Sequence, residues 1–445
     1  MRTASGAEAA SHRVDVRRPR RSRSGGARGR AFVVGMALGL IGTGCAGSPA
    51  PKDAAGGAAE TARAWNRLDL LDHLASIGDG TSEWDDLETA RRFAQLQGAI
   101  EVLRELVLHD ATSEQEASEG LRVVLKVLAM AVDDALRGDL RDPLFRRVDT
   151  RWRDVGAFNP DAEYDQAWID GRYDYRLTGN LGTVPYVSVT VNGDPATASS
   201  ALVAYLDDAT LRSHADAAGD FTVWLTRRRP EAPGAWIELP DAANGVVIRQ
   251  YVSDRDRERL ATFEIHAVGP DLPPAAPMRD EELAARIVGV TRNLVVNASW
   301  HRTLMPFALD APNRFFDRDA AAFGANVANR ENLYHMAYFE LDPDEALLVD
   351  MEPPDSVFWN LTAASFWHET SRFLTDPVSR TNAEVVPGPD GSIRFVVSGR
   401  DPGRPNWLDT GGHARGFLIL RMVGIASHPL PRVRKLSWEA LAEID

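Results

Sequence analysis

The sequence predicts an α+β protein, with an N-terminal helical segment followed by two antiparallel β-sandwich domains. Three observations lead to this fold class. Between residues 61 and 142, apolar residues recur every three or four positions, which is typical of amphipathic helices. From Trp152 onward, short runs alternate between apolar and polar residues, and Gly, Asn and Pro separate them. A Gly- and Pro-rich break at residues 269–274 divides these runs into two groups.

The helical segment, residues 61–142, is expected to hold three helices. The first covers Ala62 to Ile77. A capping box of Ser113 and Glu116 begins the third helix, which Gly138 and Pro143 end. The second and third helices are predicted from two apolar stripes: Phe93, Leu96, Ile100, Leu103 and Val107, then Leu121, Leu125, Leu128, Val132 and Leu136. We interpret this segment as a helical hairpin or small bundle that packs against the rest of the chain.

The first β domain is expected at residues 150–270 and the second at residues 331–445. A linker at 271–330 joins them and contains a helix from Asp280 to about Leu304. The predicted strands of the first domain are Tyr173–Thr178, Tyr186–Asn192, Phe221–Thr226, Gly245–Val252 and Ala261–Ala267. Those of the second are Tyr334–Leu341, Ala346–Asp350, Val357–Thr362, Ile393–Ser398 and Phe417–Val423. Short strands separated by irregular Gly- and Pro-containing turns favour sandwiches.

Charge divides the chain into two parts. Residues 1–44 hold nine Arg and two acidic residues, a net charge of +7, whereas the other 401 residues hold 41 basic and 62 acidic residues, a net charge of −21. An acidic body repels phosphate backbones, so we expect no nucleic-acid partner. The leader ends in an eleven-residue apolar run, Ala31 to Ile41. Because about 20 residues are needed to span a bilayer, this run predicts a signal peptide that directs export.

Cys45 is the only cysteine, and it directly follows the small residues Gly42, Thr43 and Gly44. This arrangement resembles the lipobox of bacterial lipoproteins, although Gly42 stands where a large aliphatic residue is usual. The alternative is an ordinary signal peptide with an incidental cysteine. Residues 45–60 consist mainly of Ala, Gly, Pro and Ser with few charges, as a flexible tether would. We therefore expect an exported envelope lipoprotein whose membrane partner is reached through lipidated Cys45.

Motifs in the β domains resemble one bacterial family. The first domain has Asn159-Pro160-Asp161 with Tyr164, followed by Tyr175 to Gly179. The second has Leu341 to Leu347, Phe358-Trp359-Asn360, and a run from Asp401 to His413. Together they resemble the domain-of-unknown-function family DUF1214 over residues 155–436. The resemblance implies β-sandwich, jelly-roll-like domains without an established activity or catalytic residues. The sequence departs from the family pattern after Trp367, so no function of that loop is carried over.

The best candidate for catalysis is the pair Asp409 and His413, in which the carboxylate would orient the imidazole as a general base. The alternative is that Asp409 caps the next segment and His413 bonds locally. His368-Glu369 begins like a zinc-protease helix, but the residue four positions after His368 is Arg372, so that class is excluded. A third metal ligand is not visible near Asp409, and we expect no metal and no cofactor.

Turns and late aromatic residues supply the candidate ligand site. Asn-Pro-Asp and Asp-Pro-Gly sequences form turns, and loops at sandwich ends often carry binding sites. Aromatic rings stack on sugars or apolar ligands, although they also fill cores. A glycine-rich turn beside Arg400 would suit an anion. The residues expected to bind a ligand are Asn159, Asp161, Tyr164, Trp359, Asn360, Trp367, Arg400, Asn406 and Trp407.

Three functions remain open on the sequence alone. The first is an envelope lipoprotein that binds a glycan or a small apolar ligand in a cleft between the β domains. The second is an envelope hydrolase or lyase that uses Asp409, His413 and loop carboxylates. The third is a scaffold whose helices dock a membrane partner. A buried, perturbed His413 beside Asp409 would favour the enzyme, and a strip of exposed aromatic rings would favour ligand binding.

Overall fold

The structure is a computed structural model that describes residues 84–135, 140–148, 156, 158–193, 201–269, 277–303, 306–318, 331–370 and 375–444. These residues lie in one compact unit that begins at Thr81. The predicted signal peptide, Cys45, the tether and the helix at Ala62–Ile77 lie outside the described residues. Among the described helices, none is both long enough and apolar enough to cross a bilayer.

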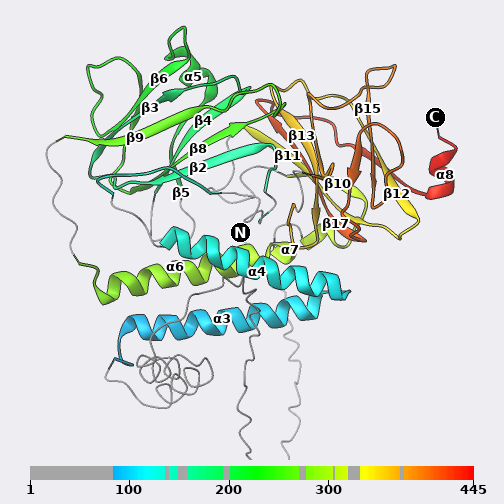
Figure 1. The fold of residues 1–445 in the computed structure, drawn as a ribbon, viewed down its shortest axis with the longest axis horizontal. Coiled ribbons are helices and arrows are strands. Elements are labelled where there is room, and N and C mark those ends of the chain that lie inside the picture. Colours follow the sequence, from blue (N-terminus) through cyan, green and yellow to red (C-terminus); the bar gives the residue numbers. More distant parts are fainter. Residues whose placement is uncertain are drawn as a thin grey trace, which may run out of the picture. The chain divides into compact units, whose positions relative to one another are not determined.

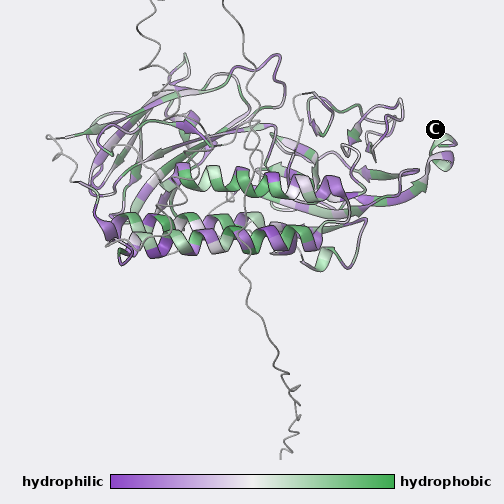
Figure 2. Ribbon diagram, turned by 60° about the horizontal axis from the view of Figure 1, so that its bottom comes forward, coloured by the Kyte–Doolittle hydropathy of each residue, from purple (hydrophilic) through white to green (hydrophobic). Residues whose placement is uncertain are grey.

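Three long helices form one layer: α3 (Glu88–Asp110), α4 (Glu114–Ala135) and α6 (Asp280–Ala298) (Figure 1). Although α6 follows the first β domain in sequence, its first residue caps α3. The Asp280 carboxylate accepts hydrogen bonds from the backbone N–H groups of Glu88 (2.9 Å) and Thr89 (3.1 Å). Figure 2 shows that polar and apolar residues alternate around these helices, as expected where one side is packed. The shorter helices are α5 (Asp208–Ser213), α7 (Trp300–Thr303), η1 (Pro306–Ala308) and α8 (Trp438–Ala442).

The predicted face of α3 is largely confirmed, and that of α4 is corrected. In α3, Leu96 and Leu103 are buried as predicted, but Phe93 is 54% exposed. In α4, Leu125 of the predicted stripe is 65% exposed, whereas Leu121, Leu128 and Val132 are half-buried against the core. The fully buried face consists of smaller residues, namely Gly120, Val123, Val124, Val127 and Ala131. Close packing against Trp367 selects small residues there, because a Cβ on Gly120 would lie 2.7 Å from the Trp367 ring.

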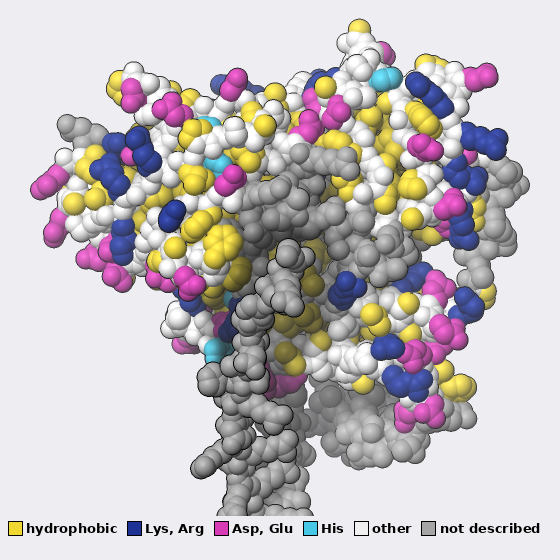
Figure 3. All heavy atoms as spheres, turned by 180° about the vertical axis from the view of Figure 1, so that it is seen from behind, with side chains coloured by type: hydrophobic (Ala, Val, Ile, Leu, Met, Phe, Trp, Pro, Cys, Tyr) yellow, Lys and Arg dark blue, Asp and Glu magenta, His cyan; other side chains and the backbone are white. Residues whose placement is uncertain are grey.

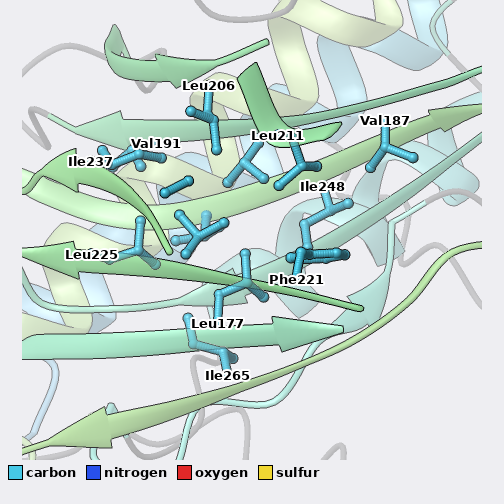
Figure 4. Packing of buried hydrophobic residues seen from close by; sticks show 14 of the residues in the cluster. Leu177, Val187, Val191, Leu206, Leu211, Phe221, Leu225, Ile237, Ile248 and Ile265 are labelled. Atoms are coloured by element: carbon cyan, nitrogen blue, oxygen red, sulfur yellow. The ribbon is translucent and has the colours of Figure 1, made fainter. Parts of the chain in front are cut away.

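The first β-sandwich consists of two sheets. Sheet A has the order β1 (Arg146–Arg147), β2 (Ala162–Trp168), β8 (Ala243–Tyr251), β4 (Tyr186–Gly193) and β5 (Ala201–Leu206). Sheet B has the order β7 (Ala235–Glu238), β6 (Asp220–Thr226), β3 (Asp174–Asn180) and β9 (Thr262–Val268). All pairs are antiparallel except β6 with β7. Figure 4 shows the core, in which Val187 and Ile248 of sheet A face Leu177 and Ile265 of sheet B.

The second β-sandwich repeats this plan. Sheet C has the order β10 (Arg314–Arg318), β11 (Asn332–Glu340), β17 (Arg415–Val423), β13 (Trp359–Ser365) and β14 (Ser379–Thr381). Sheet D has the order β16 (Trp407–Asp409), β15 (Ile393–Ser398), β12 (Glu345–Met351) and β18 (Arg432–Ser437). Phe339, Leu361 and Leu420 of sheet C pack on Val349 and Phe395 of sheet D. The α+β class with two antiparallel-rich β domains is therefore confirmed.

Sheet C is buried on both faces, and this arrangement positions the site. Its inner face fills the sandwich core. On its outer face, Phe417 and Ile419 of β17 pack against the helices, whereas Val423 packs against Tyr186 and Tyr251 of sheet A. Arg421 lies between these two contact regions on the same face, because alternate residues of a strand share a face. The outer face of sheet C thus has a helix-facing half and a half that faces the first sandwich.

Most of the strands that the sequence did not predict are short strands at sheet edges. All ten predicted strands are present with small shifts of their ends, but β1, β2, β5, β7, β10, β14, β16 and β18 were not predicted. The predicted helix from Asp280 to Leu304 is split at Ser299 into α6 and α7. Of these omissions, β2 has the largest consequence, since it carries part of the candidate site.

Candidate functional site

The candidate site lies where the outer face of sheet A meets the outer face of sheet C. Strand register places one polar row across each sheet: Tyr164, Arg249 and Ser188 in sheet A, and Tyr334, Arg421 and Asn360 in sheet C. The central arginines are only 7% and 4% exposed. We call the following set the inter-sandwich cluster: Asn159, Asp161, Tyr164, Arg249, Tyr251, Asn332, Tyr334, Asn360, Thr362, Ser379 and Arg421.

Asn360 connects the two sandwiches. Its Nδ2 lies 2.7 Å from Asn159 Oδ1 and 2.7 Å from Asp161 Oδ2, both in the chain segment that leads into β2. Ser379 Oγ donates to the same Asp161 oxygen at 2.6 Å. The strand pairing of β13 with β14 places Ser379 opposite Thr362, and their hydroxyl oxygens are 3.0 Å apart. This network holds one carboxylate of the first sandwich among amide and hydroxyl groups of the second.

The turn before β2 fixes Asn159. Pro160 restricts its neighbour to extended geometry, and the Asn159 side chain accepts a hydrogen bond from the backbone N–H of Asp161 at 3.1 Å. The Asn159 Oδ1 atom therefore receives two donors, from Asp161 and Asn360. Asn159 is 2% exposed, so this turn is buried at the junction rather than open to solvent.

Two side-chain amide atoms of the cluster are buried without a hydrogen-bond partner in the described structure: Asn159 Nδ2 and Asn360 Oδ1. The amide orientations are set by the other contacts, because flipping Asn360 would turn its oxygen toward the Asp161 carboxylate. One unpaired atom is a donor and the other an acceptor. A buried polar atom left unpaired costs about 1–3 kcal/mol, so such atoms commonly mark a ligand or an ordered water.

The two arginines bring charge into the cluster. Arg421 Nη1 donates to Thr362 Oγ1 at 3.1 Å, and its Nη2 lies 3.4 Å from the carbonyl oxygen of Phe158. The Arg249 guanidinium lies over the Tyr164 ring, 5.0 Å from its centre. Burial raises the pKa of the Asp161 carboxyl, against the opposing effect of Ser379, Asn360 and the nearby arginines. The cluster is consequently polar, tightly bonded and screened from solvent.

Tyrosines line the other end of the junction. Tyr251 is fully buried, stacks on Phe358 at 4.6 Å, and hydrogen-bonds to Asn332. The hydroxyl groups of Tyr186 and Tyr205 are 2.6 Å apart, and both donate to Glu331 Oε2. Burial raises the pKa values of the Tyr186, Tyr205 and Tyr251 hydroxyls, so they remain neutral donors.

A groove on the first sandwich lies at the Tyr205 end of the junction. The groove has a volume of about 420 Å³ and follows the edge strands β5 and β7. Its lining includes Tyr205, Trp236, Ile237 and Leu239. Because the Tyr205 hydroxyl belongs to the hydrogen-bonded end of the junction, one side chain contacts both the groove and the buried polar network.

Four of the residues predicted to bind a ligand come together in the inter-sandwich cluster. Asn159, Asp161 and Asn360 are hydrogen-bonded to one another, and Tyr164 stacks with Arg249. These residues come from sequence positions about 200 apart. Their assembly matches the expected position between the β domains, whereas their role in binding stays a prediction.

The other five predicted ligand residues lie elsewhere. Trp359 belongs to the core of the second sandwich, and Trp367 packs among the helices with its Nε1 donating to the Glu116 carbonyl at 2.8 Å. Asn406 bonds three backbone groups of Val386 and Arg394, and Trp407 Nε1 donates to the Ser398 carbonyl. Arg400 stacks on Trp438 at 3.7 Å. None of these five contacts the inter-sandwich cluster through a described hydrogen bond.

The predicted pairing of Asp409 with His413 is corrected. Asp409 accepts a hydrogen bond from the backbone N–H of Gly411 at 2.8 Å, as a local cap. His413 instead contacts Glu119 of α4, with Nε2 and Oε2 2.6 Å apart, and its Nδ1 lies 2.6 Å from the Thr410 carbonyl oxygen. Both ring nitrogens are thus engaged. The two intervening glycines have positive φ values and turn the chain away from the geometry that the spacing suggested.

Sequence reasoning missed Arg249, Arg421, Thr362 and Ser379. A signal was present for Arg421, because it is the one charged residue inside the apolar run Phe417–Val423. A charge in a doubly buried strand must be accommodated by a polar environment, and it therefore marks a site. Among the described residues, no cluster of three His, Cys, Asp or Glu has metal-binding geometry.

One family model matches the chain, with the description "Protein of unknown function (DUF1214)", at residues 157–255 and 340–426. The two matched regions contain Asn159, Asp161, Arg249, Asn360 and Arg421. Both sides of the inter-sandwich cluster therefore fall within the family domain.

Two solved structures are similar to the chain. An uncharacterised protein from Burkholderia cenocepacia is 25% identical with a TM-score of 0.72, and the match covers 78% of this chain and 97% of that one. A protein from Vibrio parahaemolyticus is 11% identical with a TM-score of 0.44, covering 72% and 98%. No curated protein matches the chain. The Burkholderia structure shows that the arrangement of these domains recurs in a second protein.

Proposed function

We propose that the two regions matched by the DUF1214 model together bind a small, hydroxyl-rich ligand, such as a glycan fragment, at the inter-sandwich cluster. One observation supports the proposal most directly. The amide of Asn159 has an unused donor and the amide of Asn360 an unused acceptor, inside the same buried network.

The unused donor of Asn159 and the unused acceptor of Asn360 together favour a hydroxyl group as their partner. A hydroxyl donates and accepts at once, so it would satisfy Asn159 Nδ2 and Asn360 Oδ1 together. A carboxylate only accepts and would leave the Asn360 oxygen unpaired, and an apolar group would leave both atoms unpaired. The glycan alternative from the sequence is therefore preferred over the small apolar ligand.

The enzyme alternative loses its stated basis, since His413 is bonded to Glu119 and Thr410 rather than to Asp409. The aromatic residues that would have formed an exposed stacking surface, Trp359 and Trp367, are each 3% exposed. Ligand recognition is consequently assigned to the polar cluster and not to an aromatic strip.

A thermal-shift experiment with the full chain tests this proposal. Neutral sugars (glucose, galactose, N-acetylglucosamine, maltose and cellobiose) are compared with glucuronate and with octanol. Binding to the folded state raises the melting temperature by mass action. We expect a neutral sugar to give the largest rise, and the Asn360→Ala variant to lose it. A panel without any shift, or a shift caused by octanol alone, would refute the proposal.

Asn406→Ala is the matched control. Asn406 is also a buried asparagine, 6% exposed, but all its amide groups are bonded within the second sandwich. This variant is expected to melt at a lower temperature than the wild type and to keep its sugar-dependent rise. Loss of the sugar response in both variants would indicate general destabilisation instead of a local binding site.

We also propose that the protein is exported and held at a membrane of the cell envelope by lipidated Cys45. The support is the basic leader, the apolar run Ala31–Ile41 and the single cysteine that follows. The wild type is expected in the membrane fraction, and Cys45→Ala in the soluble fraction. Ser48→Ala in the adjacent tether is the control. A Cys45→Ala protein that remains membrane-bound would refute lipid anchoring.

A further inference from the structure

His368 is a fully buried histidine in the turn after β13, outside the network described above. It is 0% exposed, and neither ring nitrogen has a hydrogen-bond partner among the described residues. Its ring stacks on Phe417 with centroids 3.9 Å apart, and Trp300 lies edge-on at 6.4 Å. Buried imidazoles normally bond through at least one nitrogen, so this side chain requires a specific explanation.

The backbone of His368 is held in an uncommon conformation. Its φ is 58°, in the left-handed region that non-glycine residues rarely occupy. The turn is closed by hydrogen bonds from His368 N to the Ser365 carbonyl and from Ser365 N to the Glu369 carbonyl, both 2.9 Å. Glu369 is in turn bound by Arg122 and Lys126 of α4. The surroundings thus impose this conformation, which is typical of functional positions.

The turn is physically connected to the inter-sandwich cluster. Thr370 Oγ1 donates to the carbonyl oxygen of Phe158 at 3.2 Å, and Arg421 Nη2 approaches the same oxygen at 3.4 Å. Phe417, under the His368 ring, and Arg421 lie on the same face of β17. His368 therefore stands at the helix side of the row that Arg421 and Asn360 form across sheet C.

We infer that His368 is a second ligand-binding residue, whose uncharged imidazole hydrogen-bonds another hydroxyl of the ligand that Asn159 and Asn360 hold. This inference rests on the proposed function and extends it. A neutral imidazole has one donor and one acceptor, as do the unpaired atoms of Asn159 and Asn360 taken together. Two such positions on one face suit a ligand with at least two separated hydroxyl groups, as sugars have.

The electrostatics agree with an uncharged ring. Burial, with smaller contributions from His301 and Arg421, lowers the pKa of His368 to about 3. The imidazole is therefore neutral across the physiological range. It offers a lone pair and an N–H group, but no charge that would select an anion.

His368→Phe and His301→Phe form a matched pair for testing the inference with the full chain. His301 is equally buried, but its Nε2 is bonded to Asp110 Oδ2 at 2.8 Å. His368→Phe removes the unpaired polar atoms but leaves a bulky ring at φ 58°, where histidine is better tolerated. Because these two effects oppose each other, the melting temperature should change by less than about 3 °C. Replacing His301 should lower the melting temperature, because Asp110 loses a partner.

The binding measurement uses the neutral sugar that gives the largest shift with the wild type. For His368→Phe we expect the Kd to rise about 3- to 10-fold, the equivalent of one hydrogen bond. His301→Phe should leave the Kd unchanged. If His368→Phe does not fold, His368→Asn replaces it, since asparagine tolerates positive φ and retains polar atoms at a shorter reach.

The outcomes separate this inference from the proposed function. If Asn360→Ala loses sugar binding while His368→Phe keeps the wild-type Kd, the inference is overturned and the proposed function stands. If His368→Phe lowers the melting temperature as His301→Phe does, with the Kd unchanged, His368 is structural, for instance bonded to an ordered water. If no sugar binds the wild type, both fail. A weakened Kd, with a melting temperature within about 3 °C of that of the wild type, supports the inference.

Discussion

The two halves of the outer face of sheet C differ in how completely their buried polar side chains are paired. On the helix-facing half, every charged group named here has a partner: Glu116 with Arg415, Glu119 with His413, and Glu369 with Arg122 and Lys126. On the half that faces the first sandwich, Asn159 and Asn360 each keep an unpaired buried atom. Both regions are polar and closed to solvent, so burial alone does not distinguish them.

The difference indicates distinct roles. Complete ion pairs along α4 fix the helix in one register against the sandwich, because any shift would separate charges that are costly to leave unpaired. Unpaired buried polar atoms destabilise the folded protein unless another molecule satisfies them. We therefore assign the ion pairs of the helix-facing half, called the α4 seam, to stability, and the unpaired groups, in the inter-sandwich cluster and at His368, to recognition. Figure 3 shows acidic and basic side chains interspersed on the face of the molecule seen from behind.

The largest effect is expected for Glu369→Ala in the α4 seam. The Glu369 side chain is 0% exposed and faces two cations, of which Arg122 is 48% exposed and Lys126 17%. Breaking a buried pair costs about 3–5 kcal/mol, and partial solvation of the cations places this variant near the lower value. Chemical denaturation measures the loss, and a change below about 1 kcal/mol would contradict the assignment of the seam to stability.

Asn406→Ala should lower the free energy of unfolding by about 2–3 kcal/mol, and Asn360→Ala should lower it by distinctly less. Asn406 has φ 57° and bonds three backbone groups, so alanine loses both the contacts and a favourable left-handed residue. Removing Asn360 also removes one unpaired atom, which offsets part of its lost bonds. Urea unfolding of both variants tests this order. Equal losses would remove the distinction between a satisfied and an unsatisfied asparagine.

Gly120→Ala should destabilise the protein by about 1–2 kcal/mol despite the better helix propensity of alanine. The added Cβ would lie 2.6 Å from Val107 Cγ1 and 2.7 Å from the Trp367 ring, so α4 would have to move. Gly98→Ala in α3 is the control, because no atom lies within 4 Å of its added Cβ. A stable Gly120→Ala protein would show that α4 is loosely seated.

The smallest effect is expected for the His413–Glu119 pair, which should contribute about 1–2 kcal/mol to the free energy of unfolding in a pH-dependent way. Burial lowers the pKa of His413, but Glu119 and the Thr410 carbonyl outweigh it, so the pKa lies above its usual 6.5. Burial likewise raises the pKa of Glu119, which His413 outweighs, so it lies below 4.5. The stabilisation is therefore present between these limits, and it disappears as pH rises through the elevated value or falls through the depressed one.

The difference in unfolding free energy between wild type and His413→Gln, followed from pH 4 to pH 9, measures this contribution. It should be largest near pH 5–6.5 and decline above that range. A difference that increases with pH would mean that His413 is neutral in the folded protein.

The sequence predicts features that depend on neighbouring residues better than features that depend on contacts between distant segments of the chain. Strand alternation and turn residues are local, so all ten predicted strands were found, whereas short edge strands such as β14 and β16 have too few residues for a pattern. The face of α4 was misassigned, because Gly120 is buried for reasons of space that a hydrophobic stripe does not reveal.

The candidate site was predictable in part. Asn159, Asp161 and Asn360 lie in distinctive turn and strand motifs, and these motifs drew attention to them before any contact was known. The partner of His413 was not predictable, since Glu119 is 294 residues away and ordinary in its own helix. His368 was considered only as a metal ligand, because its unpaired nitrogens and positive φ become visible in three dimensions alone.

The most direct test of the central claim is a crystal structure of the full chain grown with the neutral sugar that gives the largest thermal shift. The account predicts a sugar hydroxyl within about 3.2 Å of both Asn159 Nδ2 and Asn360 Oδ1. A single ordered water bonded to these two atoms, with the sugar absent from the junction or bound elsewhere, would contradict it.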